Sequence, residues 1–349
     1  MRKTCFVLAF FIVFIFSCKK DNTKKEPETK KKSEFQEIAN VSFNNTSINT
    51  IVVDGSGIIW VGTGSGLYLF NNNKWYLSST LNGKAINSIK VHNSEVLVAA
   101  SNGAYSYNYS NDTISITDSI RNTVIGAASK SMSVYGFGIF DKKWIGSPDG
   151  LAYFDGTTWK MNQEIKNNLG GISDVNSIAF RDTDCFFGTN GKFLYHLWYN
   201  HTKSIDAITG ASQMIGGAPN PVNNFNGELT TDTIYCVFAG SDTSIWFGSN
   251  TGLTRNKGGT SSQNGHGVFE YFLRGERVYS VIEASDKKIW AGTETGLSVK
   301  TTTDWTTYNI SNGLPGNQIY CIAEDKDLSV WIGTNKGVSH FANGSFINY

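Results

Sequence analysis

The sequence predicts an all-β fold, and three observations lead to that class. Glycine is frequent, at 36 of 349 residues, and aromatic residues make up 13%, a composition typical of strands joined by tight turns. A phrase that begins with tryptophan recurs along the chain at an interval typical of four-stranded units. Short strand-like segments within each repeat are separated by turns of Asp, Asn, Gly and Lys. Together these features predict a ring of repeated antiparallel sheets, a β-propeller.

The first 17 residues predict an export signal. Arg2 and Lys3 precede an uncharged run over 4–17, whose apolar core is too short to cross about 30 Å of hydrocarbon. The segment Ile-Phe-Ser-Cys at 15–18 resembles the lipobox of bacterial lipoproteins, with Phe16 where that family prefers a smaller residue. The resemblance implies cleavage before Cys18 and lipidation of Cys18. Cleavage elsewhere, retention of the segment as an anchor, or a chance cysteine stay open.

Residues 18–46 are expected to form the lipidated cysteine and a disordered, charged tether. Residues 19–34 contain seven Lys and four acidic residues, and Pro27 is the only residue of 19–32 that is not polar. Such a segment cannot bury enough apolar surface to fold. We therefore expect a lipid anchor in the bacterial cell envelope, at the outer membrane, facing either the periplasm or the surface. Residues 38–43 either belong to the tether or add a strand.

The propeller is predicted over residues 47–349, with seven four-stranded antiparallel blades. From the first tryptophan of the phrase to the last is 331 − 60 = 271 residues over six steps, about 45 residues per blade. The tryptophan is expected to fill the space between neighbouring blades. The Gly and Thr that follow it are expected to mark the turn into the third strand. The copies begin at Trp60, Leu97, Trp144, Phe186, Trp246, Trp290 and Trp331.

One stretch of the last repeat resembles a known family. The phrase GLPGNQIYCIAED at 313–325, followed by VWIGTNKGV at 330–338, is similar to the two-component regulator propeller repeat, and the first, fifth and sixth repeats match it too. This family forms the periplasmic sensor region of hybrid histidine kinases, usually as two seven-bladed propellers before a membrane helix and kinase modules. The resemblance implies a binding propeller, here expected as a single ring on a lipid tether without its own kinase.

Polar side chains recur near the start of the first strand of each repeat. In propellers, that end of the strand lies near the mouth of the central channel, on the face that hosts ligands. Asn amides and Tyr rings suit a neutral, hydroxyl-rich ligand such as an oligosaccharide, because stacking and directional hydrogen bonds need no net charge. The same groups could instead satisfy one another and channel waters. The predicted ligand-binding column consists of Asn49, Asn87, Tyr135, Asn176, Tyr235, Tyr279 and Tyr320.

Two insertions interrupt the regular spacing. Residues 208–232, rich in Gly, Pro and Asn, are expected to form a long loop on the mouth face that could fold down as a lid. Residues 256–267 are expected to join the third and fourth strands of the fifth repeat on the opposite face.

No metal site, cofactor or catalytic residue is predicted. The five His lie at turns or outer strands without the spacing of paired ligands. Cys185, Cys236 and Cys321 show no paired spacing. Cys236 and Cys321 fall at matching points of two repeats, where other copies carry Ser or Thr, and are expected to be small buried residues. The segments 54–57 and 325–327 resemble calcium loops but are expected to be strand turns. A Ser–His–Asp arrangement assembled by folding stays open.

The charge balance helps to choose among functions. With 30 basic and 29 acidic residues the net charge is +1, which argues against binding of nucleic acid. We expect a protein that is not an enzyme and that binds an extracytoplasmic oligosaccharide or an envelope protein, with membrane contact through the lipid alone. Two alternatives stay open. A propeller lyase or hydrolase needs His and acidic groups at the mouth, and a scaffold needs apolar patches on the fourth strands, where Trp75, Trp159 and Trp305 recur.

Overall fold

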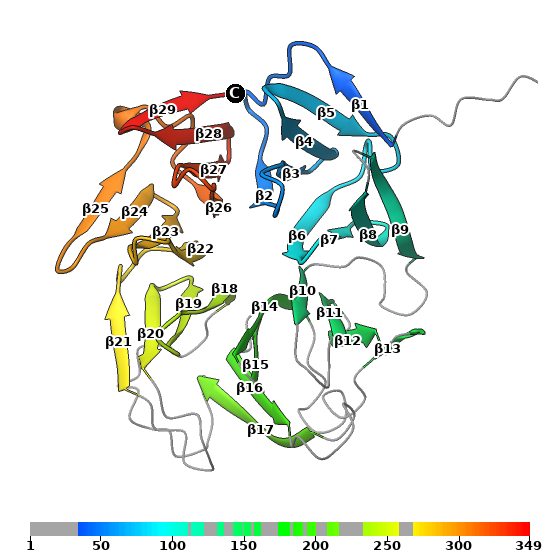
Figure 1. Ribbon diagram of the computed structural model, residues 1–349. Coiled ribbons are helices and arrows are strands. Elements are labelled where there is room, and N and C mark those ends of the chain that lie inside the picture. The colour runs from blue at the N-terminus through cyan, green and yellow to red at the C-terminus, as the bar shows by residue number, and fades with distance from the viewer. Residues whose placement is uncertain are drawn as a thin grey trace, which may run out of the picture. The chain divides into compact units, whose positions relative to one another are not determined.

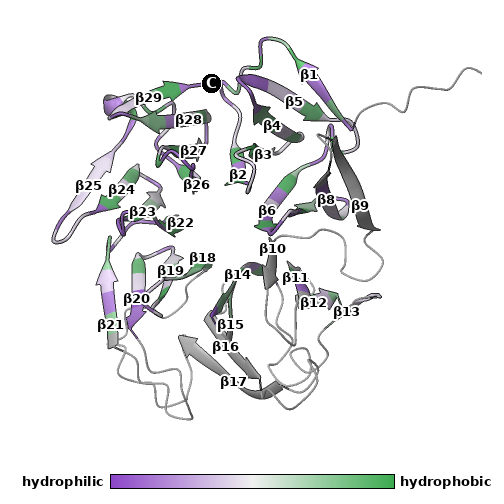
Figure 2. Cartoon of the chain, in the orientation of Figure 1, coloured by the Kyte–Doolittle hydropathy of each residue, from purple (hydrophilic) through white to green (hydrophobic). Residues whose placement is uncertain are grey.

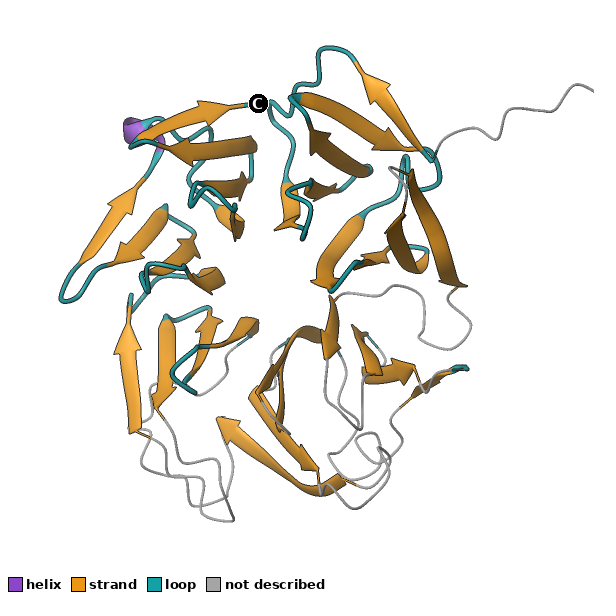
Figure 3. Cartoon of the chain, in the orientation of Figure 1, coloured by secondary structure: helices purple, strands orange, loops and turns teal. Residues whose placement is uncertain are grey.

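The described part of the chain is built almost entirely from β-strands. The computed structural model describes residues 34–110, 113–121, 131–135, 142–148, 150–154, 157–161, 174–181, 184–190, 194–199, 208–215, 233–257 and 268–349. Residues 34–349 cluster as a single unit. Figure 3 shows strands joined by loops, and the one helical element of the described residues is the 3-10 turn η1 (Ile310–Asn312). No helix within these ranges is long and apolar enough to cross a membrane. Cys18 and the expected signal peptide lie outside the described residues.

The described strands pair into seven antiparallel sheets, one of five strands and six of four. The first has the order β1-β5-β4-β3-β2, with bounds β1 (Phe35–Ile38), β2 (Ile48–Val53), β3 (Ile59–Thr63), β4 (Leu67–Asn71) and β5 (Lys74–Ser78). The second and third contain β6 (Ile86–His92), β7 (Glu95–Ala100), β8 (Gly103–Ser110), β9 (Thr113–Arg121), β10 (Ser131–Tyr135), β11 (Lys142–Ser147), β12 (Gly150–Phe154) and β13 (Trp159–Met161).

The remaining four sheets repeat the four-stranded meander in chain order. The fourth and fifth contain β14 (Val175–Arg181), β15 (Asp184–Thr189), β16 (Leu194–Tyr199), β17 (Ile208–Ile215), β18 (Ile234–Ala239), β19 (Ile245–Ser249), β20 (Leu253–Lys257) and β21 (Val268–Phe272). The sixth and seventh contain β22 (Val278–Glu283), β23 (Ile289–Thr293), β24 (Leu297–Lys300), β25 (Trp305–Tyr308), β26 (Ile319–Glu324), β27 (Val330–Thr334), β28 (Gly337–Ala342) and β29 (Ser345–Asn348).

The sheets are arranged in a ring with the first strand of each repeat innermost. Each inner strand contacts the next, from β2 through β6, β10, β14, β18 and β22 to β26, and β26 contacts β2 in turn (Figure 1). The prediction of an all-β propeller of antiparallel sheets is therefore confirmed. The expectation that every sheet has four strands is wrong for the first sheet, because β1 adds to its outer edge.

The folded unit begins earlier than the expected boundary at residue 47. Strand β1 pairs with β5, and Phe35 packs edge-on against Trp60 at 5.7 Å between ring centroids. The Glu34 carboxylate accepts hydrogen bonds from the hydroxyls of Ser78 (2.6 Å), Ser79 (3.2 Å) and Thr80 (2.8 Å). A single buried aromatic ring and one carboxylate thus hold a segment whose composition resembles that of the tether.

Apolar side chains fill the spaces between consecutive sheets, and Figure 2 shows hydrophobic segments along many strands. The tryptophans of β3, β11, β19, β23 and β27 are between 1% and 7% exposed, as predicted for residues that pack between blades. In the first and last repeats, the indole N–H also donates to a turn carboxylate, Trp60 to Asp54 Oδ2 (2.9 Å) and Trp331 to Asp325 Oδ2 (3.0 Å). Buried clusters join the first sheet to the second and the seventh sheet to the first.

The turns that resemble calcium loops use their carboxylates for local hydrogen bonds. Asp54 Oδ1 accepts from the N–H groups of Ser56 (2.8 Å) and Ile58 (3.0 Å) while its other oxygen accepts from Trp60. Among the described residues, no group of three or more His, Cys, Asp and Glu could hold a metal ion. The interpretation of these segments as strand turns agrees with this geometry.

The glycine of the repeated phrase has a different role from the one predicted. A Cβ added there would lie between 2.4 Å (Gly188) and 2.7 Å (Gly333) from the facing residue of the next sheet, so each glycine permits close contact between sheets rather than a turn. The turn depends on the next residue: Thr63 Oγ1 donates to Gly66 O (3.1 Å) and Thr334 Oγ1 to Gly337 O (3.0 Å). The glycines and the facing first residues of the next inner strand are Gly62 with Ile86, Gly188 with Ile234, Gly248 with Val278, Gly292 with Ile319 and Gly333 with Ile48.

Part of the expected long loop is a strand. Residues 208–215 form β17, which pairs with β16 as the outermost strand of the fourth sheet. Gly and Ser in this stretch masked its strand character in the sequence. Residues 216–232, on which the predicted lid depends, lie outside the described residues.

Candidate ligand-binding site

The predicted column coincides with a repeated irregularity of the inner strands. In six sheets the pairing of the first two strands skips one residue near the start of the inner strand, which is the mark of a β-bulge. A bulge re-aims the side chain of the residue that it leaves unpaired. The skipped residues are Asn49, Asn87, Asn176, Tyr235, Tyr279 and Tyr320, six of the seven predicted.

Tyr135 does not belong to this column. Ser131 pairs with Gly146 as Thr50 pairs with Gly62, so the residue equivalent to Asn49 precedes β10. Tyr135 pairs with Lys142 at the other end of the strand. The prediction of Tyr135 rested on its residue type. The strand register places it at the end of β10, whereas the column lies near the start of the inner strands.

The asparagine members, Asn49, Asn87 and Asn176, form what we call the asparagine arc. Asn49 Nδ2 donates to Ile86 O on β6 (2.9 Å), and Asn176 Nδ2 donates to Ile234 O on β18 (3.3 Å). In both cases the acceptor is the first residue of the next inner strand. These two amides are therefore engaged in joining neighbouring sheets, which is the structural alternative that the sequence left open.

The tyrosine members, Tyr235, Tyr279 and Tyr320, form the tyrosine arc on the consecutive strands β18, β22 and β26 (Figure 1). The ring centroids of Tyr235 and Tyr279 are 5.2 Å apart with an interplanar angle of 58°, and those of Tyr279 and Tyr320 are 5.1 Å apart at 68°. All three residues are half-buried. The arc is thus a continuous, partly exposed aromatic surface across three sheets.

Charged and polar groups that were not predicted from the sequence border this arc. Arg277 lies two residues before Tyr279, and its guanidinium is 3.5 Å from the Glu294 carboxylate. Glu294 follows β23, and its N–H donates to Arg277 O (2.9 Å), which brings this turn beside the start of β22. The Tyr320 hydroxyl donates to Gln318 Oε1 (2.9 Å). A polar residue two positions before each of Tyr279 and Tyr320 was the signal available in the sequence.

The pKa shifts show that the hydroxyls of the arc interact with these groups. Burial raises the pKa of Tyr279, while its hydrogen bond with Arg277 opposes that shift. Burial also raises the pKa of Tyr320, and the negative charge of Glu294 adds to the shift. The hydrogen bond with Tyr279 raises the pKa of Arg277. With raised pKa values, Tyr279 and Tyr320 are neutral at pH 7, and the ion pair of Arg277 and Glu294 lies beside them.

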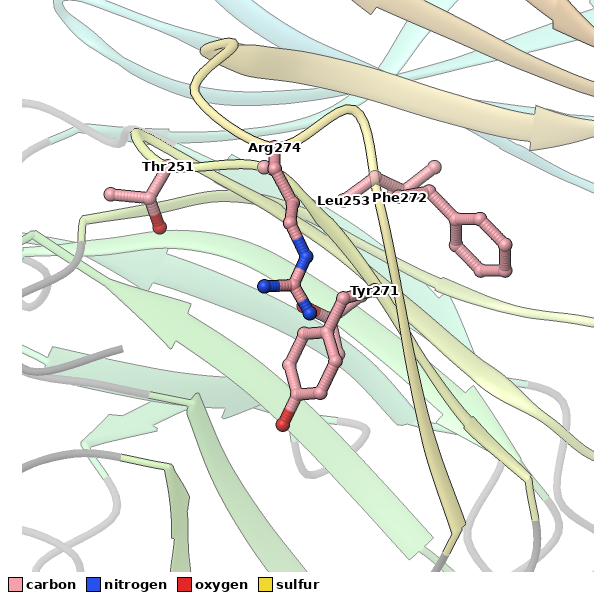
Figure 4. A pocket seen from close by; sticks show the side chains of 7 residues that line it. Thr251, Leu253, Tyr271, Phe272 and Arg274 are labelled. Carbon is pink, nitrogen blue, oxygen red and sulfur yellow. The ribbon is translucent and has the colours of Figure 1, made fainter. Parts of the chain in front are cut away.

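A cavity of about 220 Å³ lies farther out on the fifth sheet. It is bordered by the β19–β20 turn and by the connection from β21 to β22, so it opens near the same face as the arc. Figure 4 shows the Arg274 side chain extending toward Tyr271, and the guanidinium carbon is 5.2 Å from the centroid of that ring. The lining residues are Thr251, Gly252, Leu253, Thr254, Tyr271, Phe272 and Arg274.

Folding does assemble one group of Asp, Ser and His, at the β26–β27 turn. His340 Nε2 is 2.7 Å from Ser329 Oγ, and that hydroxyl donates to Asp327 Oδ1. The serine lies between the other two groups, so the imidazole is not oriented by the carboxylate as a general base needs to be. The same Asp–Ser contact recurs between Asp242 and Ser244 in the fifth repeat, which indicates turn architecture.

Of the three described cysteines, Cys236 and Cys321 are free thiols, and Cys185 is buried on β15. Burial raises the pKa of Cys236 to about 12 and also raises that of Cys321. At the equivalent position of the first sheet, Thr50 Oγ1 accepts from the N–H of Ile89 (3.2 Å). The prediction of a small buried residue is confirmed for Cys321, whereas Cys236 is only half-buried.

Comparisons with known proteins match the described fold. A family model, the two component regulator propeller, matches residues 42–65 and 313–336. Solved structures that resemble the chain include the extracellular domains of the putative hybrid two component systems BT3049 and BT4673 of B. thetaiotaomicron. Their TM-scores are 0.66 and 0.65, and their sequence identities are 17% and 18%. The matches cover 89% and 88% of this chain but 42% and 40% of those chains.

A further similar structure is PorZ of Porphyromonas gingivalis, described as a surface component of the type-IX secretion system. Its TM-score is 0.60 and its identity 15%, over 83% of this chain and 46% of PorZ. The chain thus spans less than half the length of these three proteins. No curated protein matches the sequence. The chain carries repeats of the two component regulator propeller family, which confirms the family predicted from its sequence.

Proposed function

We propose that this chain is an extracytoplasmic recognition propeller that binds a neutral, hydroxyl-rich ligand, such as an oligosaccharide, through the tyrosine arc. The observation that carries the proposal is the contact of three half-buried tyrosines from consecutive sheets, with ring centroids 5.2 and 5.1 Å apart. Aromatic faces stack on the apolar faces of sugar rings, while Arg277, Glu294 and Gln318 offer donors and acceptors to hydroxyl groups. The seven sheets act as seven blades that hold these groups in fixed register.

We propose a binding role without turnover. The groups that border the tyrosine arc offer hydrogen bonds, and the guanidinium of Arg277 is paired with Glu294 at 3.5 Å. A lyase or hydrolase needs an acid and a base that converge on the reacting bond. The His340–Ser329 contact lies in the last sheet at the β26–β27 turn, at the end of the inner strand away from the tyrosine arc.

We also propose an address in the bacterial envelope, with a lipid on Cys18. The basic start, the short apolar run and the small residue before Cys18 support this proposal. The similar structures from B. thetaiotaomicron are extracellular domains, and PorZ is a surface component. Mass spectrometry of the amino-terminal peptide tests it. A diacylated Cys18 is expected, and an unmodified peptide that begins elsewhere contradicts it.

The binding proposal is tested by thermal-shift measurements against a panel of neutral oligosaccharides. Free ligand at 100 times Kd stabilises the folded state by about 2.7 kcal/mol, which gives a clear shift. We expect Tyr279→Ala to abolish the shift and Lys288→Ala, at the β22–β23 turn on the other end of the inner strand, to retain it. A shift that survives Tyr279→Ala contradicts the tyrosine arc as the site. No shift with any sugar favours a protein partner, which a pull-down from envelope extract then identifies.

A further inference from the structure

The cavity on the fifth sheet has one charged side chain among its seven lining residues, that of Arg274. Its volume of about 220 Å³ is below the roughly 300–1,000 Å³ of sites for drug-sized ligands, so it suits a small group. Its wall is formed by the outer strands β20 and β21 and by the turns at their ends. The tyrosine arc lies on inner strands, so an occupant of this cavity need not be the ligand of that arc.

The Thr254 hydroxyl in the wall lacks the partner that its counterparts in the next two sheets have. Ser298 and Ser339 occupy the same position there, and the hydroxyl of each forms a hydrogen bond with the paired side chain on the fourth strand, at 2.9 and 2.8 Å. Thr254 pairs with Tyr271 instead and is 2% exposed, and its hydroxyl has no hydrogen-bond partner among the described residues. An unpartnered hydroxyl in the wall of a cavity is suited to a bound molecule.

The Arg274 guanidinium lies over the Tyr271 ring on the same face of the sheet. Its carbon atom is 5.2 Å from the ring centroid, and Figure 4 shows the side chain directed toward that ring. Residues paired across two strands have side chains on one face, so Thr254 and Tyr271 share this face. Arg274 has another interaction in the chain. A guanidinium has several N–H donors, so it can also donate to an acceptor in the cavity.

A second arginine of the fifth sheet shows what a stacked guanidinium binds. The guanidinium carbon of Arg255 on β20 is 5.1 Å from the ring centroid of Trp246. The same guanidinium forms ion pairs with two carboxylates, those of Glu270 (3.2 Å) and Asp242. Arginine combines stacking on aromatic faces with binding of carboxylates. No lining residue of the cavity is acidic. A carboxylate that enters the cavity would therefore complete at Arg274 the arrangement that Arg255 has.

We propose that the cavity on the fifth sheet is a binding site for a small monocarboxylate. The carboxylate accepts hydrogen bonds from the Arg274 guanidinium and from the Thr254 hydroxyl, and such bonds to an ionised acceptor are stronger than neutral ones. The small volume limits the acid to a short carbon chain. With one positive charge in its wall, the cavity suits a singly charged anion better than a doubly charged phosphate.

The test uses the full chain and acetate labelled with 13C at its carboxyl carbon, at pH 7 and constant ionic strength. The relaxation rate of the carboxyl signal, followed as a function of acetate concentration, gives Kd. Arg274→Gln is expected to weaken binding about tenfold or more, because it removes a hydrogen bond between charged groups. Arg181→Gln is the matched control and should retain the affinity. The Arg181 guanidinium on β14 is also stacked on a ring, 5.1 Å from the centroid of Phe186.

A second pair of variants tests the Thr254 hydroxyl. Thr254→Val removes the hydroxyl and keeps the shape of the side chain. It is expected to weaken acetate binding and to leave Tm unchanged, because the hydroxyl has no partner in the described residues to lose. Thr254→Ser keeps the hydroxyl, as Ser298 and Ser339 do in the next two sheets, and should retain the affinity. Equal affinity in Thr254→Val and Thr254→Ser overturns the site.

Saturable acetate binding that Arg274→Gln weakens and Arg181→Gln does not supports the site. An acetate signal that does not respond to the chain overturns it, and so does an equal response in wild type and Arg274→Gln. Phosphate that displaces acetate more strongly than formate does overturns the assignment to a carboxylate. The tyrosine arc is untouched by these variants, so either proposal can fail alone.

Discussion

The asparagine arc and the tyrosine arc occupy the same backbone position but use it differently. Both sets of residues sit at the bulge near the start of an inner strand. The Asn49 and Asn176 amides reach the carbonyl of the next inner strand, whereas Tyr235, Tyr279 and Tyr320 contact one another and leave part of each ring exposed. The same β-bulge thus joins neighbouring sheets on one side of the ring and forms a partly exposed aromatic surface on the other, which we propose as the recognition surface.

The largest expected effect is a loss of stability when the glycine beside either arc is replaced. Gly62→Ala, beside the asparagine arc, and Gly292→Ala, beside the tyrosine arc, place a Cβ 2.6 Å from Ile86 and 2.5 Å from Ile319 O, respectively. Both variants are expected to lower the free energy of unfolding by about 2–3 kcal/mol, measured by urea denaturation. A large loss of stability in one variant and none in the other contradicts the inference that these glycines permit close contact between sheets on both sides of the ring.

The second effect is a difference between the two arcs in how much their side-chain hydrogen bonds contribute to stability. Asn49→Ala removes the 2.9 Å hydrogen bond to Ile86 O and leaves that carbonyl without its side-chain donor. We expect a loss of about 1 kcal/mol in the free energy of unfolding. Tyr279→Phe, which keeps the ring contacts, is the matched comparison and should cost less. Equal losses in the free energy of unfolding for the two variants would contradict the distinction between amides that join sheets and tyrosines that form a surface.

A third test uses pH. The pKa values of Tyr279 and Tyr320 are raised in the folded state, chiefly by burial, so between the ordinary value of 10.0 and the raised value the unfolded chain binds fewer protons. Their contribution to stability is fully present below pH 10 and declines as the pH rises further. The Tyr279→Phe, Tyr320→Phe double variant should show a shallower decline above pH 10 than wild type. Asn49→Ala should keep the wild-type slope, and an unchanged slope in the double variant contradicts the assignment.

The smallest effect concerns the charges beside the tyrosine arc. The side chains of Arg277 and Glu294 are 52% and 40% exposed, so their ion pair is screened by solvent. A double-mutant cycle with Arg277→Gln and Glu294→Gln should give a coupling below about 0.5 kcal/mol in stability. A coupling well above 1 kcal/mol shows that the pair is a structural element rather than part of a binding surface.

Periodicity in the sequence was sufficient to predict the ring. The tryptophan phrase gives the repeat length, and a polar residue at one position of each first strand gives six of the seven column members. The prediction that Tyr135 belongs to the column was wrong, because it rested on residue type without knowledge of the strand register. Strand β1 was missed because its contacts, Phe35 with Trp60 and Glu34 with Ser78, join segments too far apart for any local pattern.

The finer features of the site depend on tertiary placement. Glu294 and Arg277 are 17 residues apart, and the pairing of β22 with β23 brings them together. The need for glycine at positions 62, 248 and 333 arises from the facing sheet, so the sequence shows the glycine but not its reason. Side-chain length decides which members of the column join sheets and which stay exposed. The short Asn49 side chain donates to Ile86 O, while the longer tyrosine rings contact one another.

The most direct test of this account is the affinity for an oligosaccharide that binds, measured by calorimetry on paired alanine variants of the two arcs. Tyr235→Ala, Tyr279→Ala and Tyr320→Ala are each expected to weaken binding about tenfold or more. Asn49→Ala and Asn176→Ala are expected to lower Tm and leave Kd unchanged. Equal losses of affinity from both arcs, or no loss from the tyrosine variants, would contradict the division of the column into amides that join sheets and a recognition surface.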